Sequence, residues 1–484
     1  MAASEAIEIR SGVQSHILGG RASRERGSSL VPFSMLTFLA LVGCALRSDL
    51  RFCTYVSTVS MAAYMVAVLV WRPHFYPKYF QFVFGVITDI VGCLSCELVP
   101  AYLPELGVYS QFYGSAPLLT LGRWFFVVAI LVWDECFGVE HAIEQAKDPS
   151  AHIYERRQSS IIVFCFNFGY CIFALLCFAR VASRPAFLLG IDRFRYSDLY
   201  LSGPWTKLGG WLGHCVAIPL IAMRMGQAGL SAAGILLYVL YLLWIGNKFG
   251  AFFSLVCIAI YAFYDKIFLL GRETLVRLAI SLAAVLALLV GMTTGIEVVT
   301  HGFDPARYLA TRTAQQGQLW WKIYGTYGAG EGLPELEREI DEQEEGLLEL
   351  KTEIGANVGS RYGIYNIMYL STDAARVDNK LGAGSRYTQA GFPTAYYYLG
   401  VPGVLLFAVF GGFLVAILTN ASIGAYISGR IPSAFILNKL MGSAATLLSM
   451  AIFYNLFTPG CWLSYFLLIF FWYIRRKDSR FTWL

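Results

Sequence analysis

Arginine side chains gather in two polar segments that follow long hydrophobic runs. The first segment includes "GIDRFRY", with Arg193 and Arg195, and the second, from residue 298 to residue 392, carries Arg312 and Arg386. Arginine stays charged at any relevant pH, and its planar guanidinium binds two phosphate oxygens at once. These arginines therefore predict an anionic ligand that contains phosphate.

Amides and aromatic rings accompany the second group of arginines. The stretch "RYLATRTAQQGQLWW" contains Gln315, Gln318, Trp320 and Trp321, and Tyr387 follows further along the chain. Amide groups donate and accept hydrogen bonds, and flat aromatic rings stack on other rings. We interpret this combination as a surface for a ligand that is part phosphate and part carbohydrate, such as a lipid-linked oligosaccharide diphosphate.

A lysine between two hydrophobic runs is a further cation of interest. Lys248 lies in "GNKFG", where glycines allow helix backbones to approach closely. Its ammonium group either faces a cavity between helices or extends to the lipid headgroups, and the sequence favours neither reading.

Several classes of catalytic site are excluded or disfavoured by the motifs. The chain has no P-loop, no H-E-x-x-H, no G-x-S-x-G and no dinucleotide-binding fingerprint. Its six histidines are scattered, and the C-x-x-C of Cys93 and Cys96 has no second pair nearby. We therefore expect no metal centre and no cofactor.

The elements that must position these residues are membrane helices. The 484 residues are 57% hydrophobic and only 14% charged, and the mean hydropathy is +0.57, which is typical of an integral membrane protein. We predict an all-α polytopic fold with about twelve transmembrane helices. Their centres lie near residues 38, 62, 90, 127, 170, 213, 240, 257, 286, 406, 446 and 468.

Basic residues set the predicted orientation. With the N-terminus inside, the cytoplasmic segments hold more than twice as many Lys and Arg residues as the short outer loops. Both termini are then cytoplasmic, and the net charge of +5 reflects topology rather than nucleic-acid binding. The predicted parts are an N-terminal tail (1–29), membrane helices 1–9 (30–297), a large extracytoplasmic loop (298–392), membrane helices 10–12 (393–474) and a C-terminal tail (475–484).

The large loop is expected to be partly helical. After Pro334, apolar residues recur at helical spacing among mostly acidic positions, which is typical of a solvated amphipathic helix. For the tyrosines of "AYYYLG", residues 396–398, we favour an aromatic belt at the headgroups. Asp89 and Glu97 in the third predicted span should meet polar partners inside the bundle.

The motifs and the topology resemble those of bacterial oligosaccharide repeat-unit polymerases, the Wzy-type O-antigen and exopolysaccharide polymerases, which are related to the O-antigen ligases. "GIDRFRY" and "TRTAQQGQLWW" are similar to the arginine-bearing outer loops of that family. "GNKFG" and "GSRYTQAGFPTAYYYLG" are similar to its glycine-basic motif and its arginine-containing return into the following helix. The resemblance implies a GT-C-like membrane glycosyltransferase in the bacterial cytoplasmic membrane.

The implied reaction is the polymerisation of oligosaccharide repeat units linked to undecaprenyl diphosphate, at the outer face of the membrane. The lipid diphosphate is the leaving group, and preorganised cations would stabilise its charge without a metal. We expect Arg193, Arg312 and Arg386 in this catalytic role, with Arg195 and Lys248 binding the diphosphate.

The acceptor hydroxyl must also lose a proton, and His301, Glu331 and Asp378 are the candidate bases. The ligase relatives place a histidine beside the matching arginine, whereas this chain has "GSRY" there, so the base stays open. A chain-length regulator is a further implied partner.

Two alternatives remain. A flippase for the same lipid-linked units would place its basic residues in a central cavity, and an O-antigen ligase would differ only in its acceptor.

Overall fold

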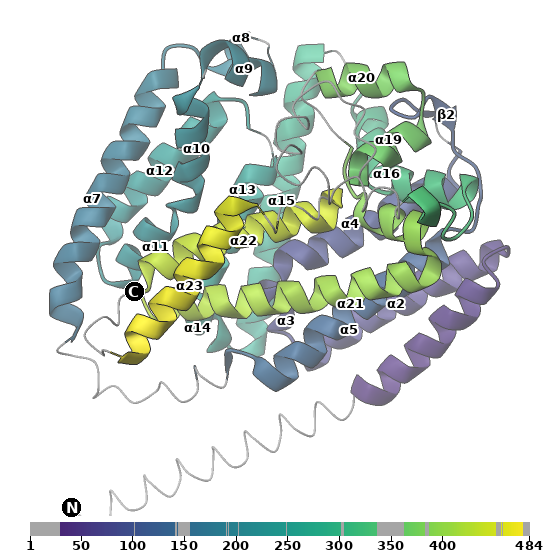
Figure 1. Ribbon diagram of the computed structural model, residues 1–484, viewed down its shortest axis with the longest axis horizontal. Helices are drawn as coiled ribbons and strands as arrows, with labels where there is room; N and C mark the ends of the chain where they lie inside the picture. The colour runs from purple at the N-terminus through teal and green to yellow at the C-terminus, as the bar shows by residue number, and fades with distance from the viewer. Residues whose placement is uncertain are drawn as a thin grey trace, which may run out of the picture.

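The computed structural model describes residues 30–100, 102–140, 143, 155–189, 191, 193–201, 203–247, 249–301, 304–335, 363–382, 387–451, 456 and 458–477. The first described helix is Leu30–Leu46. The elements that follow are α2 (Arg51–Trp71), α3 (Phe75–Lys78), α4 (Phe80–Leu98), β1 (Tyr102–Leu103), β2 (Val108–Tyr109), α5 (Ala116–Phe137), α7 (Glu155–Val181), α8 (Ala186–Leu189), α9 (Arg193–Tyr200), α10 (Pro204–His214), α11 (Ala217–Arg224), α12 (Ala228–Trp244), α13 (Phe249–Ala262), α14 (Tyr264–Phe268), α15 (Arg272–His301), α16 (Pro305–Thr326), α19 (Gly363–Ser371), α20 (Ala374–Gly382), α21 (Gly391–Ile427), α22 (Ile431–Met450) and α23 (Pro459–Lys477). The protein is thus almost entirely helical in its described part (Figure 1).

Six of the described helices are long and apolar enough to cross a membrane: α2, α4, α5, the Ile161–Val181 part of α7, α21 and α22. Four further apolar helices are shorter: Leu30–Leu46, Ala228–Trp244, Gly250–Ala262 and Pro459–Phe471. This confirms the prediction of an all-α membrane protein. All twelve predicted centres lie in helices, although the one near residue 213 belongs to a helix broken between α10 and α11. Twelve spans and a GT-C-like fold stay predictions.

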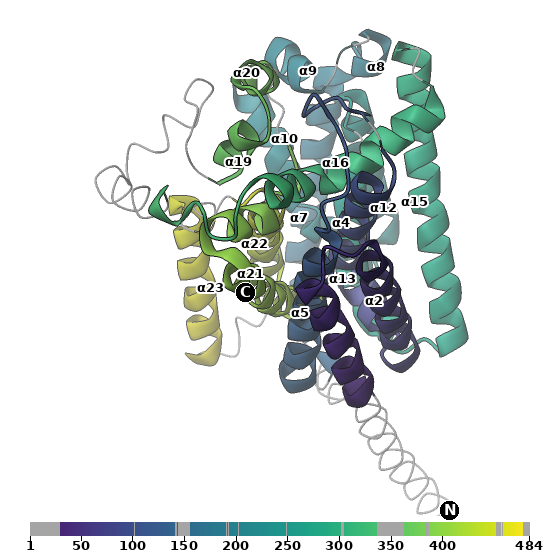
Figure 2. The same cartoon turned by 90° about the vertical axis from the view of Figure 1, so that its right-hand side faces the viewer.

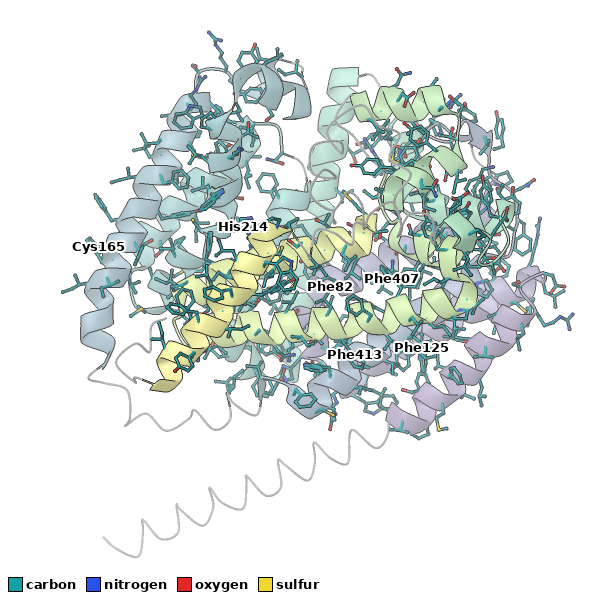
Figure 3. The ribbon with its side chains drawn as sticks, in the orientation of Figure 1. Phe82, Phe125, Cys165, His214, Phe407 and Phe413 are labelled. Carbon is teal, nitrogen blue, oxygen red and sulfur yellow. The ribbon has the colours of Figure 1, made fainter. Side chains whose placement is uncertain are left out.

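The core of the bundle lies around α5, and α7 lies at its edge. In the apolar window of α5, 72% of the residues are buried, compared with 28% in α7. Cys165 on α7 is exposed and points away from the bundle, whereas Phe407 on α21 packs in its interior (Figure 3). An apolar helix with an exposed outer face is what a lipid environment stabilises.

Two glycines bring α16 into close contact with α4. A Cβ on Gly92 of α4 would lie 2.5 Å from the backbone N of Gly317 and 2.8 Å from the carbonyl O of Thr313. Small residues at a crossing point allow two membrane-associated helices to pack backbone against backbone. α16 is therefore held against α4, a helix that is long and apolar enough to cross a membrane, and Figure 2 shows the two helices from the side.

Polar partners meet both acidic residues of α4. The Glu97 carboxylate accepts hydrogen bonds from the backbone N of Tyr113, Gly114 and Ser115, at 2.8 to 3.0 Å, and from the Ser115 hydroxyl at 2.6 Å. These donors lie in the turn that precedes α5, so the carboxylate holds this turn against the end of α4. Asp89 forms a buried ion pair with Arg123 of α5. The prediction that Asp89 and Glu97 meet polar partners is confirmed.

α21 is bent at Gly400, near its start. Gly400 has φ 65° and Pro402 follows it, and the helical hydrogen-bond pattern is interrupted there. The carbonyls of Tyr396 and Tyr397 instead accept hydrogen bonds from Gly330 and Gly332, at 3.1 and 2.9 Å. All three tyrosines of residues 396–398 are buried in protein. The expectation of an aromatic belt at this point was wrong, because these tyrosines pack against α16 and the residues that follow it.

The predicted outer segments lie at one end of the molecule. Figure 1 shows α8 and α9 at the same end as α19, α20 and the β1–β2 hairpin. The hairpin pairs Tyr102 with Tyr109 and Leu103 with Val108 in antiparallel register. We call this end the polar end.

Candidate functional site

α16 forms the floor of the candidate site. It begins after Asp304, whose carboxylate accepts a hydrogen bond from the backbone N of Arg307 at 2.7 Å, and Pro305 occupies the first helical position. Most of the polar stretch singled out in the sequence lies in this helix. Arg312, Gln315, Gln318, Lys322 and Thr326 recur at intervals of three or four residues, so they share one side of α16.

Trp320 and Trp321 lie on another side of α16 and pack in the core. They are 2% and 1% exposed. The Trp320 indole N–H donates to the carbonyl O of Ser115 at 2.9 Å, and that of Trp321 donates to the carbonyl O of Gln111 at 2.7 Å. Their predicted sugar-binding role is corrected, because buried rings whose polar atoms are already bonded offer no face to a ligand. They fix α16 to the segment that precedes α5.

Gln318 and Tyr387 also brace the fold. Both are almost fully buried, and both bind Glu105, which lies in the turn between the hairpin strands. The Gln318 amide donates to the Glu105 carboxylate, and the Tyr387 hydroxyl donates to the Glu105 carbonyl O at 2.7 Å. Lys380 of α20 pairs with the same carboxylate. We correct the sugar-binding prediction for Gln318 and Tyr387, since their polar groups hold the hairpin against α16 and α20.

Arg312 and Gln315 remain on the surface of α16. The Arg312 guanidinium donates to the Gln315 side-chain O at 2.9 Å and lies 5.2 Å from the centre of the Tyr308 ring. Arg312 has no carboxylate partner among the described residues. Its charge is therefore available to an anion at the polar end.

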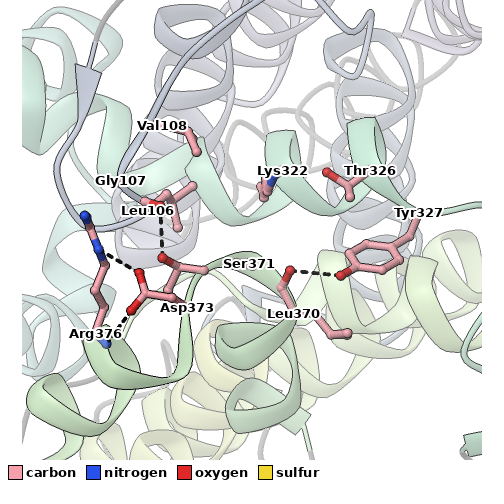
Figure 4. Close-up of a pocket in the computed structure, with 11 residues that line it drawn as sticks. Leu106, Gly107, Val108, Lys322, Thr326, Tyr327, Leu370, Ser371, Asp373 and Arg376 are labelled. Atoms are coloured by element: carbon pink, nitrogen blue, oxygen red, sulfur yellow. Dashed lines mark hydrogen bonds and ion pairs between the residues drawn. The ribbon is translucent and has the colours of Figure 1, made fainter.

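A pocket of about 420 Å³ opens beside this helix (Figure 4). Leu106, Gly107 and Val108 of the hairpin form one wall, and α16 contributes Lys322, Thr326 and the following residue, Tyr327. The opposite wall is formed by Leu370 to Asp373, at the end of α19 and in the turn before α20, together with Arg376 of α20. The volume suits a small ligand.

Hydrogen bonds hold the pocket walls together. The Thr372 hydroxyl donates to the carbonyl O of Leu106 at 2.9 Å, and the Tyr327 hydroxyl donates to the carbonyl O of Leu370 at 3.0 Å. Arg376 forms an ion pair with Asp373 at 2.8 Å and also donates to the carbonyl O of Pro104 at 3.0 Å. The turn between α19 and α20 is thus tied to both the hairpin and the end of α16.

Gly107 is required where the hairpin meets Arg376. Its φ of 70° lies in the left-handed region that favours glycine. A side chain at this position would overlap the Arg376 guanidinium. The arginine can therefore lie flat against the turn and reach the Pro104 carbonyl.

Charge is unevenly distributed along the pocket. Lys322 is half-buried and has no hydrogen-bond or ion-pair partner in the part of the chain that the structure describes. At the end of the pocket away from Arg376, burial raises the pKa of Tyr327, and the nearby negative charges of Glu331 and Glu335 add to this rise. The pocket therefore has a cationic side and a side bordered by carboxylates.

Two of the three candidate bases are described, and both accept hydrogen bonds. The Glu331 carboxylate accepts from the backbone N of Gly328 at 2.6 Å. The Asp378 carboxylate accepts from the Tyr369 hydroxyl at 2.6 Å, a bond that raises the pKa of Tyr369 to about 12. The negative charge of Glu331 also raises the pKa of Tyr327, which lines the pocket.

Several predicted residues lie outside the described side chains. Lys248 and Arg386 are not among the described residues, and nothing is described of the side chains of Arg193, Arg195 and His301. Their predicted roles stay predictions. Within the described chain, no three or more His, Cys, Asp or Glu side chains are grouped so as to hold a metal ion.

The sequence reasoning missed four residues of the site: Lys322, Asp373, Arg376 and Glu105. Lys322 carried a usable signal, because it continues the three- and four-residue spacing from Arg312 along α16. Asp373 and Arg376 come from the turn before α20 and from its first turn, and Glu105 comes from the turn of the hairpin. Only the folded arrangement brings these residues to α16.

The comparisons with known proteins assign no activity. Residues 357–471 match a family model described as a family of unknown function (DUF6418). That region covers α19 to most of α23, so it includes the wall of the pocket between α19 and α20 but not α16 or the hairpin. No curated protein and no solved structure matches the chain.

Proposed function

We propose that this protein is a membrane glycosyltransferase that polymerises oligosaccharide repeat units linked to undecaprenyl diphosphate. It would act at the outer face of the bacterial cytoplasmic membrane, with both termini in the cytoplasm. The observation that carries the proposal is the pocket at the polar end, where Lys322 has no carboxylate partner among the described residues and Arg376 is close by.

The position of the pocket fits a lipid-linked substrate. α16, which carries Lys322 and Arg312, packs directly on the membrane-spanning α4 through Gly92 and Gly317. A diphosphate attached to a lipid chain lies at the membrane surface, and its sugars extend into water. A cationic pocket fixed to a spanning helix is suited to such a ligand.

In the proposed reaction, the bond between the anomeric carbon of the donor chain and the lipid diphosphate breaks. A new bond forms between that carbon and a hydroxyl oxygen of the acceptor unit, whose proton passes to a carboxylate. Of the candidate bases, Glu331 is the one that influences a pocket residue. The diphosphate leaves with the electrons of the broken bond, and Lys322 and Arg376 would stabilise its negative charge.

The buried cations favour this proposal over a flippase. A flippase needs unpaired positive charge inside the bundle, along the path of its substrate. Lys78 lies 3.0 Å from Asp134 and 2.7 Å from Glu140, and Arg123 is paired with Asp89. These two buried charges are thus neutralised by carboxylates. The half-buried Lys439 of α22 instead donates to neutral groups, the Gly460 carbonyl O at 2.7 Å and the Ser464 hydroxyl at 3.3 Å.

Purified protein and a lipid-linked repeat unit in liposomes provide the test. We expect a ladder of products on a gel, formed by the purified protein without any other enzyme. Transport of the unit across the liposome without a ladder would overturn the polymerase and support a flippase. Transfer of a single chain onto an added lipid A acceptor, again without a ladder, would support a ligase.

In the same assay, Lys322→Gln removes the charge of the pocket lysine, and Lys207→Gln makes the same change at a control position. Lys207 is an exposed lysine of α10 outside the pocket. We expect loss of the ladder with the first variant and a normal ladder with the second.

A further inference from the structure

We infer that the pocket binds its ligand in one orientation, with the phosphates against Lys322 and Arg376 and the adjoining sugar ring against Tyr327. This inference rests on the proposed function and assigns the two parts of the substrate to the two ends of the pocket. Figure 4 shows the arrangement: Arg376 and Asp373 lie at one end, Tyr327 lies at the other, and Lys322 projects between them.

The phosphate end has two donors of different kinds. The Lys322 ammonium is a compact charge on a flexible stem, and it has no other partner among the described residues. The Arg376 guanidinium is held in place by Asp373 and by the Pro104 carbonyl. A phosphate can therefore meet one fixed planar donor and one mobile donor.

The sugar end has a fixed aromatic ring. The Tyr327 hydroxyl is bonded to the Leu370 carbonyl, and its ring packs edge to face on Tyr397 with centres 5.4 Å apart. These contacts hold the ring in one position, and the exposed Thr326 hydroxyl lies beside it. A preorganised ring with a neighbouring hydroxyl suits a sugar, which stacks with its C–H face and hydrogen-bonds at its edge.

The reverse orientation is unfavourable. Glu331 and Glu335 act electrostatically on Tyr327, so phosphates placed at that end would meet two negative charges. At the other end, Asp373 is the one carboxylate among the described lining residues; it is already paired with Arg376 and accepts from the backbone N of that residue at 3.0 Å. The charge gradient along the pocket thus selects the orientation.

Three probes test this inference with the purified full-length protein: inorganic pyrophosphate, farnesyl diphosphate, and N-acetylglucosamine joined to farnesyl diphosphate. Calorimetry gives the affinity for each. Lys322→Gln should weaken binding of all three by roughly tenfold to hundredfold, because a charge-assisted hydrogen bond is lost. Tyr327→Leu should weaken only the glycosylated probe, by roughly fivefold.

Control variants test whether a loss of binding comes from misfolding or from the change of any lysine or tyrosine. Lys322→Arg keeps the charge and should retain pyrophosphate binding, which separates a binding role from a folding defect. Lys207→Gln and Tyr473→Leu change an exposed lysine and an exposed tyrosine outside the pocket and should bind all probes normally.

Two outcomes would overturn the orientation: unchanged pyrophosphate binding in Lys322→Gln, or an equal loss for pyrophosphate and the glycosylated probe in Tyr327→Leu. The ladder assay separates this failure from failure of the proposed function. If the wild type produces a ladder and both pocket variants bind all probes normally, only the orientation is overturned. If the variants show the expected binding pattern but the wild type produces no ladder, the orientation is upheld and the polymerase function is overturned.

Discussion

The contact between α4 and α16 offers the sharpest test of how the site is held. In Gly92→Ala, the new Cβ would lie 2.5 Å from the backbone N of Gly317 and 2.8 Å from the carbonyl O of Thr313. Heavy atoms in ordinary contact are about 3.5 Å apart, so α16 must move away from α4 by about 1 Å. Both neighbouring atoms belong to backbone, and no flexible side chain can absorb the overlap.

The expected loss of stability in Gly92→Ala follows from the contacts that depend on the distance between α4 and α16. The distance from the Trp320 indole N to the Ser115 carbonyl O is 2.9 Å, and a 1 Å shift would lengthen it to about 3.9 Å, beyond hydrogen-bond range. The lost bond costs about 1 kcal/mol, and overpacking costs about 1–3 kcal/mol. We expect the free energy of unfolding to fall by about 2–4 kcal/mol. Because α16 carries Lys322, we also expect the polymerisation rate to fall about a hundredfold.

Thermal unfolding in detergent and the ladder assay measure the two effects. Gly85→Ala is the control, because Gly85 lies in the same helix and a Cβ there would meet nothing within 4 Å. That variant should be as stable as the wild type, or more stable by about 0.5–1 kcal/mol, since alanine favours a helix. If Gly92→Ala unfolds and polymerises like Gly85→Ala, the close contact does not position the site.

Four further predictions concern charged groups and metal ions. Arg312→Ala and Arg386→Ala should leave the protein inserted and abundant but abolish long-chain polysaccharide on a gel, and normal chain length in both would contradict their assigned role. Glu97→Ala should lower the free energy of unfolding by about 3–5 kcal/mol, because four donors lose their buried acceptor; an unfolding midpoint equal to that of the wild type would show that Glu97 does not hold this turn. Asp89→Leu alone should cost about 3–5 kcal/mol, and adding Arg123→Met should restore most of it in the same measurement. EDTA should leave the ladder unchanged, and a ladder that returned only with added Mg²⁺ would exclude the metal-independent reaction.

The helices were predictable to a large extent, and the site only in part. Long apolar runs specify helices by themselves, and all twelve predicted centres lie in helices. Arg312 and Gln315 were predicted as site residues because a charged and an amide side chain are unusual next to a long hydrophobic run. Trp320 and Gln318 were misread because residue type and local spacing do not reveal which side of a helix is buried. That depends on α4 and on the hairpin, which are more than 200 residues away in the sequence.

The sequence by itself determined that this is an all-α membrane protein with a polar, arginine-bearing stretch next to an apolar helix. Hydrophobic transfer acts on each segment separately, so composition and length are sufficient for that conclusion. Only the tertiary structure decided that Lys322, Arg376 and Tyr327 line one pocket while Trp320 and Trp321 face the core. The reason is physical. The close contact of Gly92 with Gly317 limits how α16 can rotate against α4, and Tyr396 and Tyr397 are buried by their contacts with Trp320 and Tyr327. Neither arrangement follows from the properties of a single segment.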